Sequence, residues 1–352
     1  VALRSDGDVE KCEALQAGEA FGTATSPNGT EFETGQTYYQ SAAFDPDNNK
    51  IGVCYRDQGN SSYPTIVVGG ITDAAAGAFA FGTPVVLESV ASVFDSNANR
   101  VLACYMDSDD SNKLIAQAFT ARGGTDNDIQ TLGAKLFICA AISDPPLLCF
   151  DSNDNKVMVM YPESTDSGYP YARALTIDAS DNSIAGGTAV RLTNDNAAST
   201  SGNGGFLLHD PVKNINIASH QGNSSQFEAW LFTSASGSIT AGQHILINDT
   251  TDDTTMGNFV SGVYDPDNAK VIFFHGQSGI LGTVGVISGT GADATFTIEA
   301  RTRIHARNDV DGGGNVEYMD AIYDTNSNKT VLLYKSTSGD TGNFALVPTI
   351  AK

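Results

Sequence analysis

The sequence predicts an all-β fold, a six-bladed β-propeller built from four-stranded antiparallel blades. Three observations predict it: an internal repeat with six copies, short apolar runs rich in Val, Ile, Phe and Tyr, and 36 glycines among 352 residues. Runs of this length suit strands and are too short for helices. The glycines, with Ser, Thr, Asn and Asp between the runs, indicate many tight turns.

The repeat is centred on an Asp-rich turn that connects the first two strands of each unit. Three copies are nearly identical, namely FDPDNNKI at residues 44–51, FDSNANRV at 94–101 and FDSNDNKV at 150–157. We call the conserved first Asp of each copy the anchor aspartate; the six are Asp45, Asp95, Asp151, Asp210, Asp265 and Asp324. They are 50, 56, 59, 55 and 59 residues apart, which fits four short strands with loops.

The two ends of the chain predict how the ring closes. After Asp324 only two more strands fit before the last residue, whereas Phe21-Gly22-Thr23 copies Phe81-Gly82-Thr83. We therefore expect residues 18–26 to supply the outer strand of the last blade, because closure removes an exposed sheet edge. The domain would span residues 18–352, with residues 1–17 as an N-terminal arm or tether.

Charge and composition exclude several classes of protein. Lys and Arg number 19 against 41 Asp and Glu, a net charge of −22, which argues against a nucleic-acid partner. No apolar stretch approaches the roughly 20 residues that span a bilayer, so no membrane insertion is expected. The five cysteines are odd in number and lack a CxxC pair, which predicts free thiols in the core.

One position in the repeat suggests a ligand site. At the end of each second strand stands an aromatic ring with a polar tip, and acids follow it in the first three repeats. The column comprises Tyr55, Tyr105, Tyr161, His220, His275 and Tyr334, and the acids are Asp57, Asp107 and Glu163. Such rings could stack on sugars, or they could pack between blades with each polar tip bonded to the backbone, which is the favoured interpretation.

Two segments suggest a calcium site, and each has a structural alternative. The anchor turns are rich in carboxylate and amide oxygens, as a calcium site requires. Asp and Asn are also the usual formers of tight turns, and this structural role is the favoured interpretation. Alternating oxygens at Asp309, Asp311 and Asn315 form the second candidate, in a Gly-rich segment that a flexible loop explains equally well. We expect no cofactor, with calcium as the alternative.

The sequence carries no enzyme motif. It lacks GxSxG, HExxH, a P-loop and a dinucleotide fingerprint. Its arginines fall at unrelated places in the repeats, so no converging cluster of the kind that acidic-sugar hydrolases need can be inferred.

The amino-acid sequence of the repeats resembles that of repeats in virion-surface and tail-fibre proteins of marine tailed bacteriophages, most closely at residues 44–57 and 59–69. This resemblance implies a non-enzymatic protein on the virion surface that binds host polysaccharide or decorates the capsid or tail. The loops between the second and third strands differ in every repeat, for example at residues 58–64, 108–113 and 163–170; this variable loop face would bind the partner, and the N-terminal arm would contact other virion proteins. The alternatives are a secreted, glycosidase-like carbohydrate-active enzyme and a calcium-dependent adhesion module on a bacterial surface.

Overall fold

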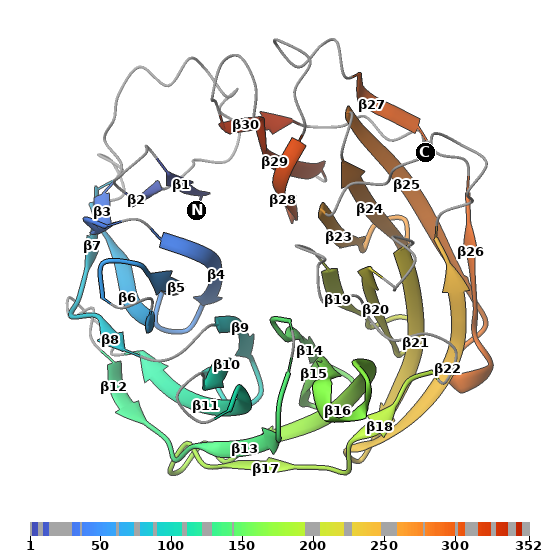
Figure 1. Cartoon of the computed structure of the whole chain (residues 1–352), viewed down its shortest axis with the longest axis horizontal. Helices are drawn as coiled ribbons and strands as arrows, with labels where there is room; N and C mark the ends of the chain where they lie inside the picture. Colours follow the sequence, from blue (N-terminus) through green and yellow to red (C-terminus); the bar gives the residue numbers. More distant parts are fainter. Residues whose placement is uncertain are drawn as a thin grey trace. The chain divides into compact units, whose positions relative to one another are not determined.

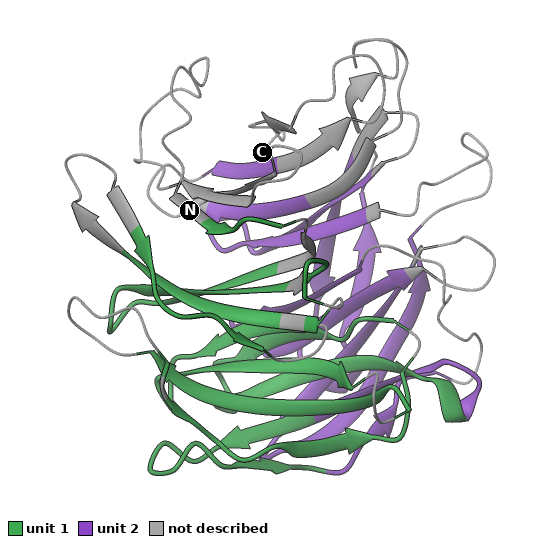
Figure 2. Ribbon diagram, turned by 60° about the vertical axis from the view of Figure 1, so that its left-hand side comes forward, with its two compact units in different colours: residues 1–165, 174–187 green, residues 166–173, 188–352 purple. Residues whose placement is uncertain are grey.

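The computed structural model describes most of the repeat region and parts of the N-terminal segment (Figure 1). The described residues are 2–5, 10–13, 30–35, 37–60, 63–73, 78–86, 90–107, 111–121, 129–142, 144–193, 205–221, 227–247, 259–276, 279–299, 302–306, 316–324, 329–336 and 343–346. They contain strands and two short 3₁₀ turns but no α-helix, and no helix that could span a membrane. Two compact units divide the chain, residues 1–165 with 174–187 and residues 166–173 with 188–352 (Figure 2).

Each of the six repeats builds one antiparallel sheet, as predicted. The first three contain β4 (Thr37–Asp45), β5 (Lys50–Asp57), β6 (Tyr63–Asp73), β7 (Ala78–Phe81) and β8 (Val85–Val86); β9 (Val90–Asp95), β10 (Arg100–Asp107), β11 (Lys113–Ala121), β12 (Ile129–Leu132) and β13 (Leu136–Cys139); and β14 (Leu147–Asp151), β15 (Lys156–Glu163), β16 (Tyr169–Ile177), β17 (Ile184–Gly186) and β18 (Val190–Arg191). In these three sheets the fourth strand is divided in two, and both pieces pair with the third strand.

The last three repeats follow the same plan with small differences. They contain β19 (Gly205–Asp210), β20 (Ile215–Gln221), β21 (Phe227–Ala235) and β22 (Ser238–Leu246); β23 (Phe259–Asp265), β24 (Lys270–Gly276), β25 (Gly279–Ser288), β26 (Thr295–Ile298) and β27 (Thr302–Ala306); and β28 (Val316–Asp324), β29 (Lys329–Ser336) and β30 (Asn343–Leu346). The 3₁₀ turns are η1 (Ser164–Asp166) and η2 (Gly291–Asp293). Among the described residues the last sheet has three strands.

The N-terminal segment adds a sheet that the repeat does not predict. Strands β1 (Ala2–Ser5), β2 (Glu10–Glu13) and β3 (Thr30–Glu33) pair in that order, so the described strands form seven sheets rather than six. The expected arm, residues 1–17, thus contains two paired strands. The motif could not indicate this sheet because the segment has no copy of the Asp turn. Phe21 and the closing strand expected over 18–26 lie outside the described residues, so ring closure stays a prediction.

The side-chain carboxyl of an anchor aspartate holds its turn by accepting hydrogen bonds from the turn's backbone N–H groups. In the five repeats whose turns are described, the anchor Oδ1 accepts the backbone N–H groups two and three residues later, at 2.9–3.2 Å. The fourth residue after the anchor adopts a left-handed conformation with φ between 49° and 57°. Asn occupies that place in four repeats and Ala269 in the fifth, and Asn tolerates this conformation better than Ala. The turn that follows Asp324 lies outside the described residues.

Ala269→Asn is therefore expected to stabilise the protein by about 0.5–1 kcal/mol, because the substitution relieves a left-handed alanine. The measurement is the midpoint of urea unfolding. Asn155→Ala, at the equivalent place with φ 54°, should shift the midpoint in the opposite direction. Equal midpoints for all three proteins would contradict this account of the turn.

Two core clusters of the described residues lie between the sheets of successive repeats. One cluster joins Cys54 and Ile66 of the first repeat to Val101, Ala103 and Phe119 of the second, and a similar cluster joins the fourth and fifth repeats. The thiols of Cys54, Cys104, Cys139 and Cys149 are buried, and none of the four forms a disulfide. Burial raises the pKa of Cys54 to about 12, so this thiol is a core residue rather than a nucleophile.

A serine hydrogen bond links neighbouring first strands at the same place in two repeats. Ser41 Oγ accepts the Ser92 N–H at 3.2 Å, and Ser261 Oγ accepts the Ala321 N–H at 3.0 Å. Each serine stands four residues before its anchor aspartate, and each donor stands three before the next anchor. A repeated position therefore carries a repeated contact between sheets, which fixes their spacing.

Candidate functional site

The aromatic column lies in the interior. Tyr55, Tyr105 and Tyr161 have no accessible surface, and His220 and His275 are 3% exposed. A ligand would therefore have to enter packed protein to touch them. The side chain of Tyr334 lies outside the described residues.

The polar tips of at least three of these rings bond to nearby side chains, and His275 Nε2 lies 3.4 Å from Thr283 Oγ1. The Tyr55 hydroxyl donates to Glu33 Oε2 and the Tyr105 hydroxyl to Gln117 Oε1, both at 3.3 Å. Burial, and then the charge of Glu33, raises the pKa of Tyr55. These contacts are those of a packed interior, and the ligand role of the column stays a prediction.

The three acids that follow the column occupy the ends of β5, β10 and β15. Asp57 is buried and its Oδ1 accepts the Asn60 N–H at 3.1 Å. Asp107 and Glu163 are partly exposed, and Glu163 Oε1 accepts the Thr165 hydroxyl at 2.8 Å. These acids therefore mark the same end of the second strand in three repeats.

The residues proposed for a metal outside the turns, Asp309, Asp311 and Asn315, lie outside the described residues. Within the part of the chain that the structure describes, no group of three or more His, Cys, Asp or Glu side chains is arranged to hold a metal ion.

Asp144 is an acid of interest in the structure that the sequence analysis did not single out. It lies on the connection between β13 and β14 and is 7% exposed. Its Oδ2 has no hydrogen-bond partner among the described residues. Burial raises the pKa of this carboxyl to about 6, because a buried carboxylate without donors loses its hydration.

The local sequence removes one donor that a turn aspartate usually has. An anchor aspartate is satisfied by the N–H groups two and three residues later, but the residues that follow Asp144 are Pro145 and Pro146. Proline has no N–H, so the bond from the second residue cannot form. A carboxyl that would otherwise make a tight turn is left without its first donor.

Backbone contacts hold the part of the connection that precedes Asp144. The Ile142 N–H donates to the Asn112 carbonyl at 3.0 Å, and the Ser164 N–H donates to the Ala141 carbonyl at 3.0 Å. Ile142 also forms an isolated antiparallel bridge with Glu163. Asp144 and Glu163 thus lie on adjoining segments, at the end of the second strand where the column acids lie.

A carboxyl with these properties is suited to proton transfer. With a pKa near 6 it is mainly ionised at neutral pH, yet its conjugate acid is strong enough to return the proton. Strongly perturbed carboxyls gather at functional sites, although some are structural. Asp144 is the residue that we take as the centre of the candidate site.

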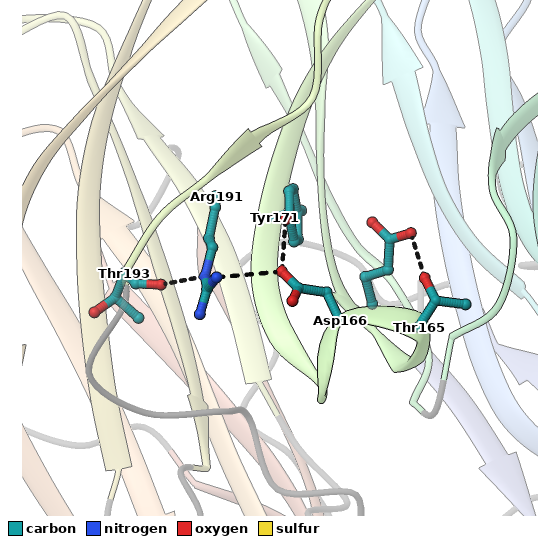
Figure 3. Close-up of polar contacts among 6 residues, drawn as sticks. Thr165, Asp166, Tyr171, Arg191 and Thr193 are labelled. Atoms are coloured by element: carbon teal, nitrogen blue, oxygen red, sulfur yellow. Dashed lines mark hydrogen bonds and ion pairs between the residues drawn. The ribbon is translucent and has the colours of Figure 1, made fainter.

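A second polar cluster lies around the end of β18 (Figure 3). The Cζ atom of Arg191 lies 3.3 Å from the centre of the Tyr169 ring. Its Nε donates to the Thr193 carbonyl at 3.0 Å, and its Nη1 lies 3.3 Å from Asp166 Oδ2. The Tyr171 hydroxyl donates to the same Asp166 oxygen at 2.7 Å. The guanidinium is therefore held in one plane by three neighbours.

Comparisons with known proteins give matches in structure only. No protein-family model matches the chain, and the search of curated proteins gives no match. Among similar structures is the periplasmic gluconolactonase PpgL of Pseudomonas aeruginosa, with a TM-score of 0.62 and 7% identity over 99% of this chain and 92% of that one.

Two further structures are similar. A putative 6-phosphogluconolactonase of Bacteroides uniformis has a TM-score of 0.57 and 11% identity over 87% of this chain and 83% of that one. AofleA of Arthrobotrys oligospora has a TM-score of 0.51 and 10% identity over 90% and 87%. At these identities the likeness shows the fold alone, a repeat all-β fold of the propeller type.

These similar structures overturn the function that was expected from the sequence of the repeats. The prediction of a non-enzymatic virion-surface protein is wrong, because the similar structures include lactonases and nothing supports a relationship to phage tail fibres. Short Asp and Asn turn motifs recur wherever hairpins need them, so a resemblance in these turns does not show a shared role. The expected glycan partner and extracellular location stay predictions.

Proposed function

We propose that the chain is a carbohydrate-active hydrolase that opens a cyclic sugar ester, a lactone, with Asp144 as the proton-transfer group. The observation that carries the proposal is the buried Asp144 carboxyl, without a partner for Oδ2 among the described residues and with its pKa raised to about 6. The fold shared with a gluconolactonase supports the choice of substrate class.

The chemistry needs one base of this kind. The Asp144 carboxylate takes a proton from a water molecule as the water oxygen bonds to the lactone carbonyl carbon. The ring C–O bond of the tetrahedral intermediate then breaks, and the departing ring oxygen receives the proton from Asp144. One lactone and one water give one hydroxy acid, and the carboxylate is restored.

The charge of the chain favours a neutral sugar lactone over a phosphorylated one. With a net charge of −22 and only 19 cationic residues, the average field opposes a phosphate group. A glycosidase is the second candidate, but it requires two carboxyls that face each other across the scissile bond. Glu163, on the adjoining segment, already accepts a hydrogen bond from Thr165, so lactone opening fits the described residues better.

The test is acid release measured at constant pH with gluconolactone and with an unsubstituted lactone of the same ring size, together with the absorbance of the phenol released from an aryl glycoside. We expect gluconolactone to open faster than its uncatalysed rate, the unsubstituted lactone to open more slowly and the glycoside to remain intact. Gluconolactone opening only at the uncatalysed rate, or cleavage of the glycoside, would refute the proposal.

A further inference from the structure

The Arg191 cluster holds a cation whose Nη1–Nη2 edge is only partly used by the described residues. A guanidinium has five N–H groups; among the described residues, Arg191 Nε donates to the Thr193 carbonyl and Nη1 forms an ion pair with Asp166. Its Nη2 has no partner among the described residues, and the side chain is 28% exposed. The edge formed by Nη1 and Nη2 is the edge that binds a carboxylate through two parallel hydrogen bonds.

The surroundings keep that edge in a fixed orientation. The face of Tyr169 supports one side of the guanidinium plane, and the Thr193 carbonyl fixes the Nε end. Asp166 is held in turn by the Tyr171 hydroxyl. A cation positioned in advance loses little conformational entropy when a ligand binds.

We propose that Arg191 is the recognition group of a binding site for a sugar carboxylate. The inference rests on the proposed function, because opening a sugar lactone yields a sugar acid, which is a ligand of this class. The carboxylate would bind the Nη1–Nη2 edge.

Removing the charge of Asp166 is expected to strengthen the binding of a carboxylate at Arg191 rather than weaken it. Its carboxylate lies 3.3 Å from Nη1, so it competes with a ligand carboxylate for the same edge and repels it. Asp166→Asn keeps the size of the side chain and removes the negative charge. If the cluster only braces the strand ends, the same substitution should leave binding of any anion unchanged.

The experiment is calorimetric titration of the full chain with gluconate and with sorbitol, which replaces the carboxylate by a neutral CH₂OH group. We expect the protein to bind gluconate and not sorbitol. Arg191→Ala and Arg191→Lys should each weaken gluconate binding about 10-fold to 100-fold, because lysine cannot form the paired bonds or stack on Tyr169. Asp166→Asn should tighten it about 2-fold to 5-fold.

Equal binding of gluconate by the parent protein and folded Arg191→Ala, or no change with Asp166→Asn, would overturn the inference. Circular dichroism spectra establish that each variant is folded. The two proposals fail separately: lactone turnover without gluconate binding removes this site only, and gluconate binding without lactone turnover removes the hydrolase only.

Discussion

Replacing Asp144 by Asn is expected to lower the rate of gluconolactone opening about 100-fold to 10,000-fold, the usual contribution of a positioned general base. The amide keeps the size of the side chain but cannot accept the proton of the attacking water. The measurement is kcat/KM from acid release at constant pH. Asp293→Asn, at an exposed carboxyl on η2, is the matched control and should leave the rate unchanged.

The same substitution is expected to stabilise the fold, which separates a functional carboxyl from a structural one. Burial raises the pKa of Asp144 to about 6, above its value in the unfolded chain, so ionisation of this group costs folding free energy. The cost is absent below the unfolded pKa of about 4, grows between about pH 4 and 6 and is fully present above that range.

Asp144→Asn should therefore raise the free energy of unfolding by about 1–3 kcal/mol at about pH 8 and by much less at about pH 4. Urea unfolding at both values of pH gives the comparison. A variant that is destabilised at about pH 8 would mean that the carboxylate has stabilising partners, contrary to the unpartnered Oδ2.

Gly133→Ala is expected to destabilise the protein by about 3 kcal/mol or more. A Cβ at this position would lie 2.0 Å from the Asn182 carbonyl oxygen and 2.8 Å from its carbonyl carbon. Asn182 cannot retreat, because it is buried and its side-chain amide donates to the Thr131 carbonyl at 3.0 Å and to Thr120 Oγ1 at 3.1 Å. Arg100 also donates to the Asn182 side chain.

Urea unfolding of Gly133→Ala beside Gly35→Ala measures this effect. At Gly35 the nearest atom to a new Cβ lies 3.6 Å away, an ordinary contact, so only a small change is expected there. Similar losses in the two variants would contradict the view that Gly133 permits the turn of the third repeat to approach the second.

The repeat predicted the sheets because every copy carries its own turn chemistry. Asp45 and its counterparts satisfy backbone N–H groups within four residues, so a local pattern was enough to locate each hairpin. The sheet of β1, β2 and β3 was not predicted, because its pairing depends on partners that carry no such motif. Residues that meet across the fold, such as Gly133 and Asn182, can be far apart in the chain, here by 49 residues, so their contact leaves no local sequence pattern.

The candidate site was harder to predict for a related reason. Comparison of equivalent positions in the repeats found the aromatic column of Tyr55 and its counterparts. Equivalent positions are most alike where sheets pack together, and the described side chains of this column are indeed buried. Asp144 stands outside the repeat, so that comparison could not find it. Its one sequence signal is the Asp-Pro-Pro run at 144–146, in which proline removes a donor that a turn aspartate needs.

The pH dependence of kcat/KM for gluconolactone tests the central claim most directly. With Asp144 as general base, the rate should rise with pH through a midpoint at about 6 and level off above it, and Asp144→Asn should lose this rise. A profile without a rise near that pH, or the same rise in the parent protein and in Asp144→Asn, would contradict the role of Asp144.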